Sequence, residues 1–344
     1  MTSEPKVSIG IPTYNRADLL KEAIESVLRQ TYSNLELIIS DNGSDDDTEK
    51  VVKKFINETE SIKIVYSKFD KTVPVYDNWK KVLSLSDATY FAWLQDDDLI
   101  RSDFIENGVK ALIQNKNSTV YSCYAQFNDQ PLIKHNMAVW GSPFYLNWVK
   151  NETLVLNGYS LIPIALYDGF GYSPVALFNR EILIRCQEYL SNEYWLHNER
   201  MIMIHASLGH KIIFDSKIGG LFRSHSGQMS YVLNDKSRIN KDNLLYLNDL
   251  QKLYDRLGDV IFKEFDEHLE KVDLVKKVAW RKAAIPFKDV NTLTKKSFSI
   301  LNKHVDKKKK SNPTFFLKMH IQRVIKILLT PYQWIVQSLM KMRN

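Results

Sequence analysis

Apolar and polar positions in the first hundred residues alternate between short strands and amphipathic helices. The run Lys6–Ile11 has the pattern of a buried strand, and we expect Pro12 to end it. Apolar residues then recur at helical spacing from Asp18 to Gln30. The same order continues with a strand over Leu35–Ser40, a helix over Asp45–Asn57, a strand over Ile62–Tyr66, a helix over Tyr76–Ser84 and a strand over Tyr90–Leu94.

Strands that alternate with helices predict an α/β fold, Rossmann-like, with a mostly parallel central sheet flanked by helices. Ligands of such sheets bind beyond the carboxyl ends of the strands. Each predicted strand is followed by polar residues, so we expect these residues to meet at one edge. They are Thr13, Tyr14 and Asn15, then Asp41, then Asp70, and finally Asp96, Asp97 and Asp98.

The rest of the chain divides into regions of different pattern. Residues 100–235 are less regular, with a helix expected near Trp195–Leu208, and they complete a domain over residues 1–235. Residues 236–302 form a predicted helical region, which makes the C-terminal extension helical. Residues 303–344 form a basic amphipathic tail.

The tail concentrates the positive charge of the chain. Residues 303–344 carry ten Lys or Arg and one acid, whereas the net charge of the whole chain is +7. The body is therefore close to neutral, which argues against nucleic acid as a partner. Two apolar and basic segments, 315–329 and 332–342, are too interrupted to span a membrane and fit a helix lying on a membrane surface. The alternative is that they pack on the body with their lysines exposed.

Composition and the chain start narrow the setting. Hydrophobic residues make up 44% and charged residues 25% of 344 residues, as in an ordinary globular protein. Cys123 and Cys186 lack metal-site spacing, so we expect reduced, buried thiols. The start shows no signal-peptide pattern. With the basic tail, this predicts a cytoplasmic protein, peripheral on the inner face of the cell membrane.

The acidic run after the fourth predicted strand is the first candidate for chemistry. Asp96, Asp97 and Asp98 have no basic neighbour before Arg101, and packed carboxylates repel unless a cation relieves them. Carboxylate oxygens suit Mg²⁺ or Mn²⁺, particularly where phosphates complete the shell. The alternative is a solvated acidic turn that caps the next helix.

Three segments together resemble the family 2 glycosyltransferases of GT-A fold. They are Val7–Asn15 (VSIGIPTYN), the run Gln30–Tyr32 with LELIISDNGSDDDT after it, and the cluster Asp96–Asp98. The resemblance covers residues 5–110 and extends more loosely to about residue 230. It implies a GT-A domain over residues 1–235 that uses a UDP-, GDP- or dTDP-sugar. It also implies inverting transfer to a glycan or lipid-linked acceptor in surface polysaccharide biosynthesis.

The resemblance also implies roles for the residues at the strand ends. A nucleoside diphosphate leaves the sugar in such a reaction, and its negative charge calls for a Lewis acid such as Mn²⁺ or Mg²⁺. Asp41 has an alternative role, since an Asp at the start of DNGS can simply cap the turn. The resemblance implies that the loop bordering the nucleotide is formed by Pro12, Thr13, Tyr14 and Asn15. It implies that Asp41 contacts the base ring and that Asp70 contacts the base or the ribose. It also implies that Asp96 or Asp97 contacts the ribose and that Asp98 binds the metal.

The catalytic base is less directly indicated. The family usually has an acidic pair about eleven residues before a glycine that ends a helix, and eleven residues before Gly209 stands Asn198. Glu199 is one residue away, and it is the base that we predict. His197 is the alternative base, because imidazole can also accept a proton near neutral pH. Glu199 could instead pair only with Arg200.

A late loop resembles a further family segment. Over Phe222–Ser230, Arg223 could meet the diphosphate, because its guanidinium suits paired phosphate oxygens. His225 could bind the metal or support its ligands. A lone His in a loop is otherwise often incidental.

Two other functions compete with the transferase. Sugar nucleotidyltransferases usually follow the first strand with a glycine-rich loop, but Pro12–Arg16 contains no glycine. An inactive GT-A-like scaffold at the membrane is favoured by the missing acidic pair and opposed by Asp96–Asp98.

Overall fold

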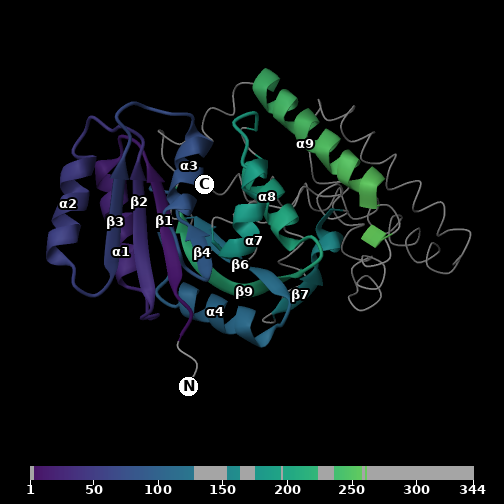
Figure 1. Cartoon of the computed structure of the whole chain (residues 1–344), viewed down its shortest axis with the longest axis horizontal. Helices are drawn as coiled ribbons and strands as arrows, with labels where there is room; N and C mark the ends of the chain where they lie inside the picture. The colour runs from purple at the N-terminus through teal and green to yellow at the C-terminus, as the bar shows by residue number, and fades with distance from the viewer. Residues whose placement is uncertain are drawn as a thin grey trace, which may run out of the picture.

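The chain is represented by a computed structural model that describes residues 4–127, 153–162, 175–194, 197–223, 236–257 and 260–261. These residues form a nine-stranded sheet with helices on both faces (Figure 1). The strands follow one another in space as β3-β2-β1-β4-β8-β6-β9-β5, and β7 pairs with β9. The predicted α/β class with a mostly parallel sheet is therefore confirmed, although the second half of the sheet is mixed.

Four parallel strands form the N-terminal half of the sheet. The central strand β1 pairs with β2 on one side and with β4 on the other, and β2 pairs with β3. All four carboxyl ends therefore point to one edge. The elements of this half are β1 (Val7–Thr13), α1 (Ala17–Leu28), β2 (Leu35–Asp41), α2 (Thr48–Glu58), β3 (Lys63–Lys68), α3 (Val75–Ser84) and β4 (Tyr90–Trp93).

Pro12 does not end the first strand, as the sequence had led us to expect. Strand β1 continues to Thr13, and Pro12 stays in register with Ser40 of β2. The Gly10 carbonyl accepts from the Leu94 amide on the β4 side, so Pro12, two residues on, also turns its backbone nitrogen to that side. Strand β4 has already ended at Trp93, so the missing N–H of proline costs no ladder hydrogen bond.

The second half of the sheet mixes directions. Strand β8 is antiparallel to both β4 and β6, whereas β9 runs parallel to β6 and antiparallel to β5 and β7. Strand β9 thus ends beside the short β5, close to the turn that follows β4. The elements of this half are β5 (Leu99–Ile100), α4 (Phe104–Gln114), β6 (Ser118–Phe127), β7 (Leu154–Asn157), β8 (Ala176–Asn179), α7 (Arg180–Arg185), α8 (Asn198–Ser207), β9 (Lys211–Phe222) and α9 (Lys236–Leu257), with 3₁₀ turns at 158–160 and 187–189.

The buried side chains form one apolar cluster on each face of the sheet. In β2, Leu37 and Ile39 join the cluster with α1 and α4, while Ile38 joins the cluster with α3, α7 and α8. This follows from the two-residue period of a strand, which makes a strand buried on both faces apolar throughout. The sheet edge is thereby held rigidly between two layers.

Helix α9 extends the second cluster. Its residues Tyr246, Leu250 and Leu253 are buried with Met201 of α8 in the same apolar cluster. In Figure 1 the helix lies on the α7 and α8 side of the molecule. Part of the predicted helical region 236–302 is thus a helix packed on the domain, while the proposed boundaries themselves stay predictions.

Other expectations concern the thiols and the tail. Both cysteines are free and buried. No helix within the described ranges is long and apolar enough to cross a membrane. The basic tail, residues 303–344, lies outside the described residues, and its membrane role stays a prediction.

Candidate active site

The loops after β1 and β2 are tied together at the carboxyl edge of the sheet. The Asn15 amide donates to Ser44 Oγ at 2.9 Å, and the Asp45 amide donates to Asn15 Oδ1 at 3.0 Å. Asn15 has a φ of 51°, a left-handed conformation that asparagine tolerates better than most residues. The predicted nucleotide-bordering loop is therefore fixed by its neighbour, with Pro12 buried beneath it and the Tyr14 side chain exposed.

The acidic turn after β4, Asp96–Asp98, is buried. Its three carboxylate residues are 5%, 7% and 1% exposed in chain order. Thr13, at the end of β1, donates through Oγ1 to Asp96 Oδ2 at 2.8 Å. The first strand end and the acidic turn are thus brought together, as the topology predicted.

Arg16 neutralises two of the three carboxylates. Its Nη1 lies 2.8 Å from Asp96 Oδ1 and 2.7 Å from Asp97 Oδ2. Charge-assisted hydrogen bonds of this kind are the strong ones in a partly buried setting. The sequence reasoning missed Arg16, although its place directly after the β1 loop put it at the same edge.

Arg223, which follows β9, holds the acidic turn in place. Its backbone amide donates to Asp98 Oδ1 at 3.0 Å, and its Nε donates to the Asp97 carbonyl. Its Nη1 lies 2.8 Å from Glu22 Oε2, and Nη2 donates to the Leu19 carbonyl at 2.9 Å. The guanidinium thus joins β9 to α1 and holds the turn. Its predicted contact with a diphosphate stays a prediction, and Glu22 is a partner that sequence reasoning missed.

Asp98 keeps one oxygen uncompensated. Its Oδ2 is buried and has no hydrogen-bond partner within the described part of the chain. Burial, together with the charge of Asp97, raises the pKa of Asp98 well above its ordinary value. A buried carboxylate in this state is stabilised in its charged form by a nearby cation. The turn therefore fits a divalent cation at Asp98.

A cation at Asp98 would need further ligands. The described residues contain no cluster of three His, Cys, Asp or Glu side chains with metal-site geometry. His225, the second predicted metal ligand, lies outside the described residues. Diphosphate oxygens of a donor are the other oxygen ligands that hard cations accept.

The two remaining predicted donor contacts differ in their surroundings. Asp41 is fully buried, with Oδ1 accepting from the Ser44 amide at 2.8 Å and Oδ2 accepting from the Tyr66 hydroxyl at 2.7 Å. It therefore caps the turn, as its alternative role required, and its contact with a base ring stays a prediction. Asp70 is exposed after β3.

Glu199 lies at the start of α8, half-buried. Burial raises the pKa of Glu199 to about 7; the nearby Arg200 lowers it, and Asp242 of α9 raises it. A carboxylate whose pKa lies near the working pH is suited to act as a general base. Among the described residues, Glu199 and Arg200 form no direct ion pair, although the charge of Arg200 lowers the pKa of Glu199.

His197 has both ring nitrogens facing charged neighbours. Its Nδ1 lies 3.0 Å from Arg200 Nη1, and its Nε2 lies 3.7 Å from Asp242 Oδ2. Guanidinium only donates, so Nδ1 is the acceptor and Nε2 carries the proton that faces Asp242. This arrangement favours Glu199 over His197 as the base. Asp242 was not foreseen, because 45 residues separate it from His197 in the chain.

Helix α3 connects the acidic turn region with the region of Glu199. Asn78 Nδ2 donates to the Ser40 carbonyl at 3.1 Å, at the end of β2. The Tyr76 amide, at the start of the same helix, donates to Asn192 Oδ1 at 3.1 Å. One helix thus contacts Ser40 and Asn192, which are 152 residues apart in the chain.

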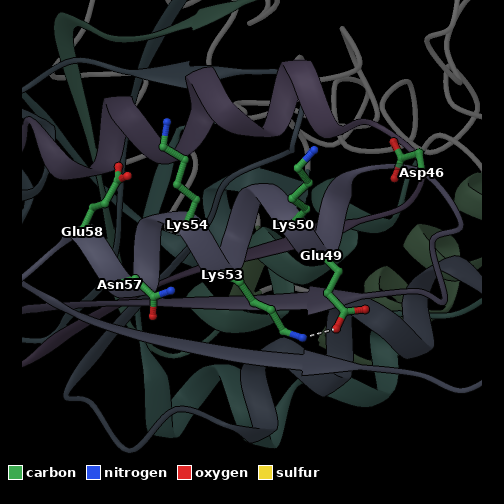
Figure 2. A pocket seen from close by; sticks show the side chains of 7 residues that line it. All are labelled: Asp46, Glu49, Lys50, Lys53, Lys54, Asn57 and Glu58. Carbon is green, nitrogen blue, oxygen red and sulfur yellow. Dashed lines mark ion pairs between the residues drawn. The ribbon is translucent and has the colours of Figure 1, made fainter.

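A hollow elsewhere on the surface has no comparable chemistry. It lies along α2 and is lined by lysines and acids such as Lys53 and Glu49, whose ion pair measures 2.6 Å (Figure 2). Its lining belongs to α2 and to Asp46 just before it, not to the strand ends. The buried turn and the α8 terminus are the stronger candidate.

A family model supplies the decisive comparison. Residues 8–182 match the model of Glycosyl transferase family 2, which is just over half of the chain. The chain belongs to this family. The family resemblance and the enzyme class drawn from the sequence, a glycosyltransferase, are thereby confirmed.

Curated relatives match parts of the chain. An uncharacterized glycosyltransferase of Rickettsia conorii is 29% identical over 255 residues, which are 72% of this chain and 38% of the relative. A GalNAc(5)-diNAcBac-PP-undecaprenol beta-1,3-glucosyltransferase of Campylobacter jejuni is 33% identical over 113 residues, or 33% of this chain and 35% of the relative. The chain thus spans well under two thirds of the length of these relatives.

Two solved structures share the fold. The mannosyltransferase PcManGT of Pyrobaculum calidifontis, in complex with GDP-Man and Mn²⁺, has a TM-score of 0.54 at 16% identity, over 91% of this chain and 89% of that one. Residues 1–349 of S. aureus TarS, in complex with UDP-GlcNAc, have a TM-score of 0.51 at 17% identity, over 80% of each chain. At this identity the likeness shows the GT-A-like fold alone.

Proposed function

We propose that this chain transfers a sugar from a nucleotide-sugar donor to a hydroxyl group of a glycan or lipid-linked acceptor, in an inverting reaction that depends on a divalent cation. The observation that carries the proposal is the buried turn Asp96–Asp98 of a family 2 chain, in which Asp98 Oδ2 has no partner among the described residues. The solved neighbours that share the fold were captured with GDP-Man and Mn²⁺ and with UDP-GlcNAc, which supports a donor of this class.

The donor would lie across the carboxyl edge of the sheet. Thr13 donates to Asp96 Oδ2 and Asn15 is tied to the neighbouring loop at Ser44, and Asp96 or Asp97 would contact the ribose. Pro12, Tyr14, Asp41 and Asp70 are the further donor contacts of this proposal. Mn²⁺ or Mg²⁺ held by Asp98, with His225, would supply positive charge opposite the leaving diphosphate.

Glu199 would act on the acceptor. Its carboxylate accepts the proton of the acceptor hydroxyl while that oxygen forms a bond to the anomeric carbon. The bond from the anomeric carbon to the diphosphate oxygen breaks, and the nucleoside diphosphate leaves with the electron pair. A pKa of about 7, raised by burial, leaves a useful fraction of Glu199 ionised at neutral pH.

Two observations support a lipid-linked acceptor. The Campylobacter jejuni relative is a glucosyltransferase whose name specifies a PP-undecaprenol substrate. Residues 303–344 of this chain are strongly basic, and such a segment is attracted to anionic lipid surfaces. The chain would thus build a surface polysaccharide from the inner face of the cell membrane.

Donor binding tests the proposal directly. Calorimetric titration of UDP-, GDP- and dTDP-sugars would be run with and without Mn²⁺ on the wild type, Asp98→Ala and Asp45→Ala. Asp45→Ala is the matched control, because it removes an exposed carboxylate from the same sheet edge. We expect one nucleotide to bind only with Mn²⁺, to be lost in Asp98→Ala and retained in Asp45→Ala. If the wild type binds none of them, the membrane scaffold becomes the better reading.

Vesicle binding tests the membrane part separately. Replacing Lys307, Lys308, Lys309 and Lys310 by Gln removes four positive charges from the tail. The affinity for vesicles rich in anionic lipid, measured by sedimentation, should fall by up to about 10³-fold, because each of the four charges contributes about 1 kcal/mol. Equal sedimentation of variant and wild type would contradict a role for this run.

A further inference from the structure

A cluster of buried and half-buried polar side chains joins α8 to α9, outside the segment that matches the family model. It consists of His197, Glu199 and Arg200 at the start of α8 and of Asp242 and Tyr246 on α9. We propose that Asp242 is a positioning residue, through which α9 holds His197 and the first turn of α8 in the orientation that Glu199 needs as a base. This inference rests on the proposed function.

The first turn of α8 depends on these contacts because it lacks an ordinary cap. His197 occupies the N-cap position, and its side chain makes no capping hydrogen bond. Helix starts are commonly stabilised by such a bond. Here the His197 ring lies between Arg200, 3.0 Å from Nδ1, and Asp242, 3.7 Å from Nε2. The ring thus links the helix start to α9.

The contact between His197 and Asp242 is buried. Asp242 is 3% exposed and His197 is 5% exposed. A carboxylate buried to this degree is costly unless polar or charged groups surround it. The Asp242 carboxylate faces the ring edge of His197, with Oδ2 3.7 Å from Nε2. Asp242 therefore constrains where His197 can lie.

Tyr246 fixes the same ring from a second direction. Its ring stacks on His197, with centroids 4.2 Å apart and planes at 18°. Tyr246 follows Asp242 by four residues, so both lie on one face of α9. Leu250 and Leu253 continue that face into the apolar cluster. The helix is therefore anchored well enough to act as a fixed support.

Titratable and charged groups from three elements surround Glu199. His197 and Arg200 lie at the start of its own helix, Asp242 and Tyr246 lie on α9, and Tyr76 lies on α3, where burial and then the charge of Glu199 raise the pKa of Tyr76. Asp242 opposes ionisation of Glu199 and Arg200 favours it. Removing the Asp242 charge must therefore allow Glu199 to ionise at lower pH.

Helix α9 offers a matched control. Asp249 lies seven residues after Asp242 on the same helix face, where Tyr194 Oη donates to it and Lys252 Nζ lies 2.8 Å away. Asp249→Asn removes an acid of the same type from α9 without touching His197.

The test reads the Glu199 carboxyl directly in the full chain. Glutamate would be labelled with ¹³C at Cδ, and the Glu199 signal assigned by its loss in Glu199→Gln. The wild-type signal should titrate near pH 7, as the pKa of about 7 that burial produces requires. The midpoint should fall by about half a pH unit or more in Asp242→Asn and stay unchanged in Asp249→Asn. An unchanged midpoint in folded Asp242→Asn would overturn the proposal.

A second measurement needs no variant at Asp242. In wild-type protein, ¹⁵N–¹H spectra should show His197 as the neutral tautomer protonated at Nε2, because Arg200 can only donate to Nδ1. Protonation at Nδ1 instead would overturn the contact even if Asp242→Asn fails to fold. The proposal for Asp242 and the proposed function can each be contradicted independently of the other. If Glu199→Gln kept full transfer activity, the base assignment would be wrong, while the titration would still report whether Asp242 acts on Glu199.

Turnover adds a readout that a purely structural role would not move. In Asp242→Asn the acid limb of kcat should shift to lower pH in step with the Glu199 signal. A loss of kcat that is equal at every pH would contradict the proposal, because it reports instability without a change at the base.

Discussion

The turn Asp96–Asp98 and the cluster at the start of α8 both bury carboxylates, but they compensate the charge differently. At the turn, Arg16 lies within 2.8 Å of both Asp96 and Asp97, and one oxygen of Asp98 is left without a partner in the described structure. At α8, burial and a mixture of nearby charges set the pKa of Glu199 to about 7. The first arrangement suits a site that receives a cation, and the second suits a site that receives a proton.

Removing the proton acceptor should have the largest effect. In Glu199→Gln the side chain keeps its size and loses its basicity, so kcat should fall by about 10²–10⁴-fold. Metal-dependent donor binding should be unchanged, since it belongs to the other site. Steady-state transfer assays and calorimetry would measure the two properties. Loss of donor binding in this variant would mean that the two sites are not separate.

Removing the Arg16 guanidinium should destabilise the turn Asp96–Asp98. Arg16→Met leaves Asp96 and Asp97 without their nearest positive charge, and we expect the free energy of unfolding to fall by about 1–3 kcal/mol, discounted because the guanidinium is partly exposed. Mn²⁺ should restore part of that loss. Urea denaturation with and without Mn²⁺ would show it. Arg29→Met, whose exposed pair with Glu25 spans 3.9 Å, is the control and should change little.

Removing the charge of Asp98 should raise the free energy of unfolding, whereas removing that of Arg16 should lower it. Burial raises the pKa of Asp98, so this group favours the folded state most below its unfolded pKa, and that contribution is lost as pH rises through the folded pKa. In metal-free buffer, Asp98→Asn should therefore raise the free energy of unfolding by about 1 kcal/mol at pH 8 and by little at pH 4. Denaturation at both pH values would test this. A destabilised variant at pH 8 would contradict an uncompensated charge at this position.

The smallest effect is expected away from both sites. Lys53→Ala removes the exposed pair with Glu49 along the α2 hollow, at a cost of about 0.5 kcal/mol or less (Figure 2). Transfer activity should be unchanged. A clear drop in kcat would reveal a function for that surface.

The N-terminal half of the fold could be predicted because its information is local. A two-residue or helical period identifies each element within about ten residues, and the parallel topology then brings Thr13 to Asp96 without further knowledge. Pro12 was misjudged because its tolerance depends on where β4 ends. A neighbouring strand's length cannot be read from the proline itself.

The rest of the site could not be predicted because its contacts are distant along the chain. Nothing in the sequence pairs Arg223 with Glu22, or His197 with Asp242. Such side chains meet only after helices and strands have packed, and no periodic pattern encodes that meeting. Glu199 was predicted from the spacing of a family motif. The raised pKa that suits Glu199 to act as a base comes from burial and from Asp242 of α9.

The bond between the Arg223 amide and Asp98 spans 125 residues of chain, which has a consequence for synthesis. At typical rates of about 5–20 residues per second, roughly 6–25 s pass between the translation of Asp98 and that of Arg223. During that interval the parallel strands β1 to β4 are already made, yet the turn that follows them lacks its closing strand. The turn Asp96–Asp98 is therefore among the last parts of the described sheet to gain all of its contacts during synthesis.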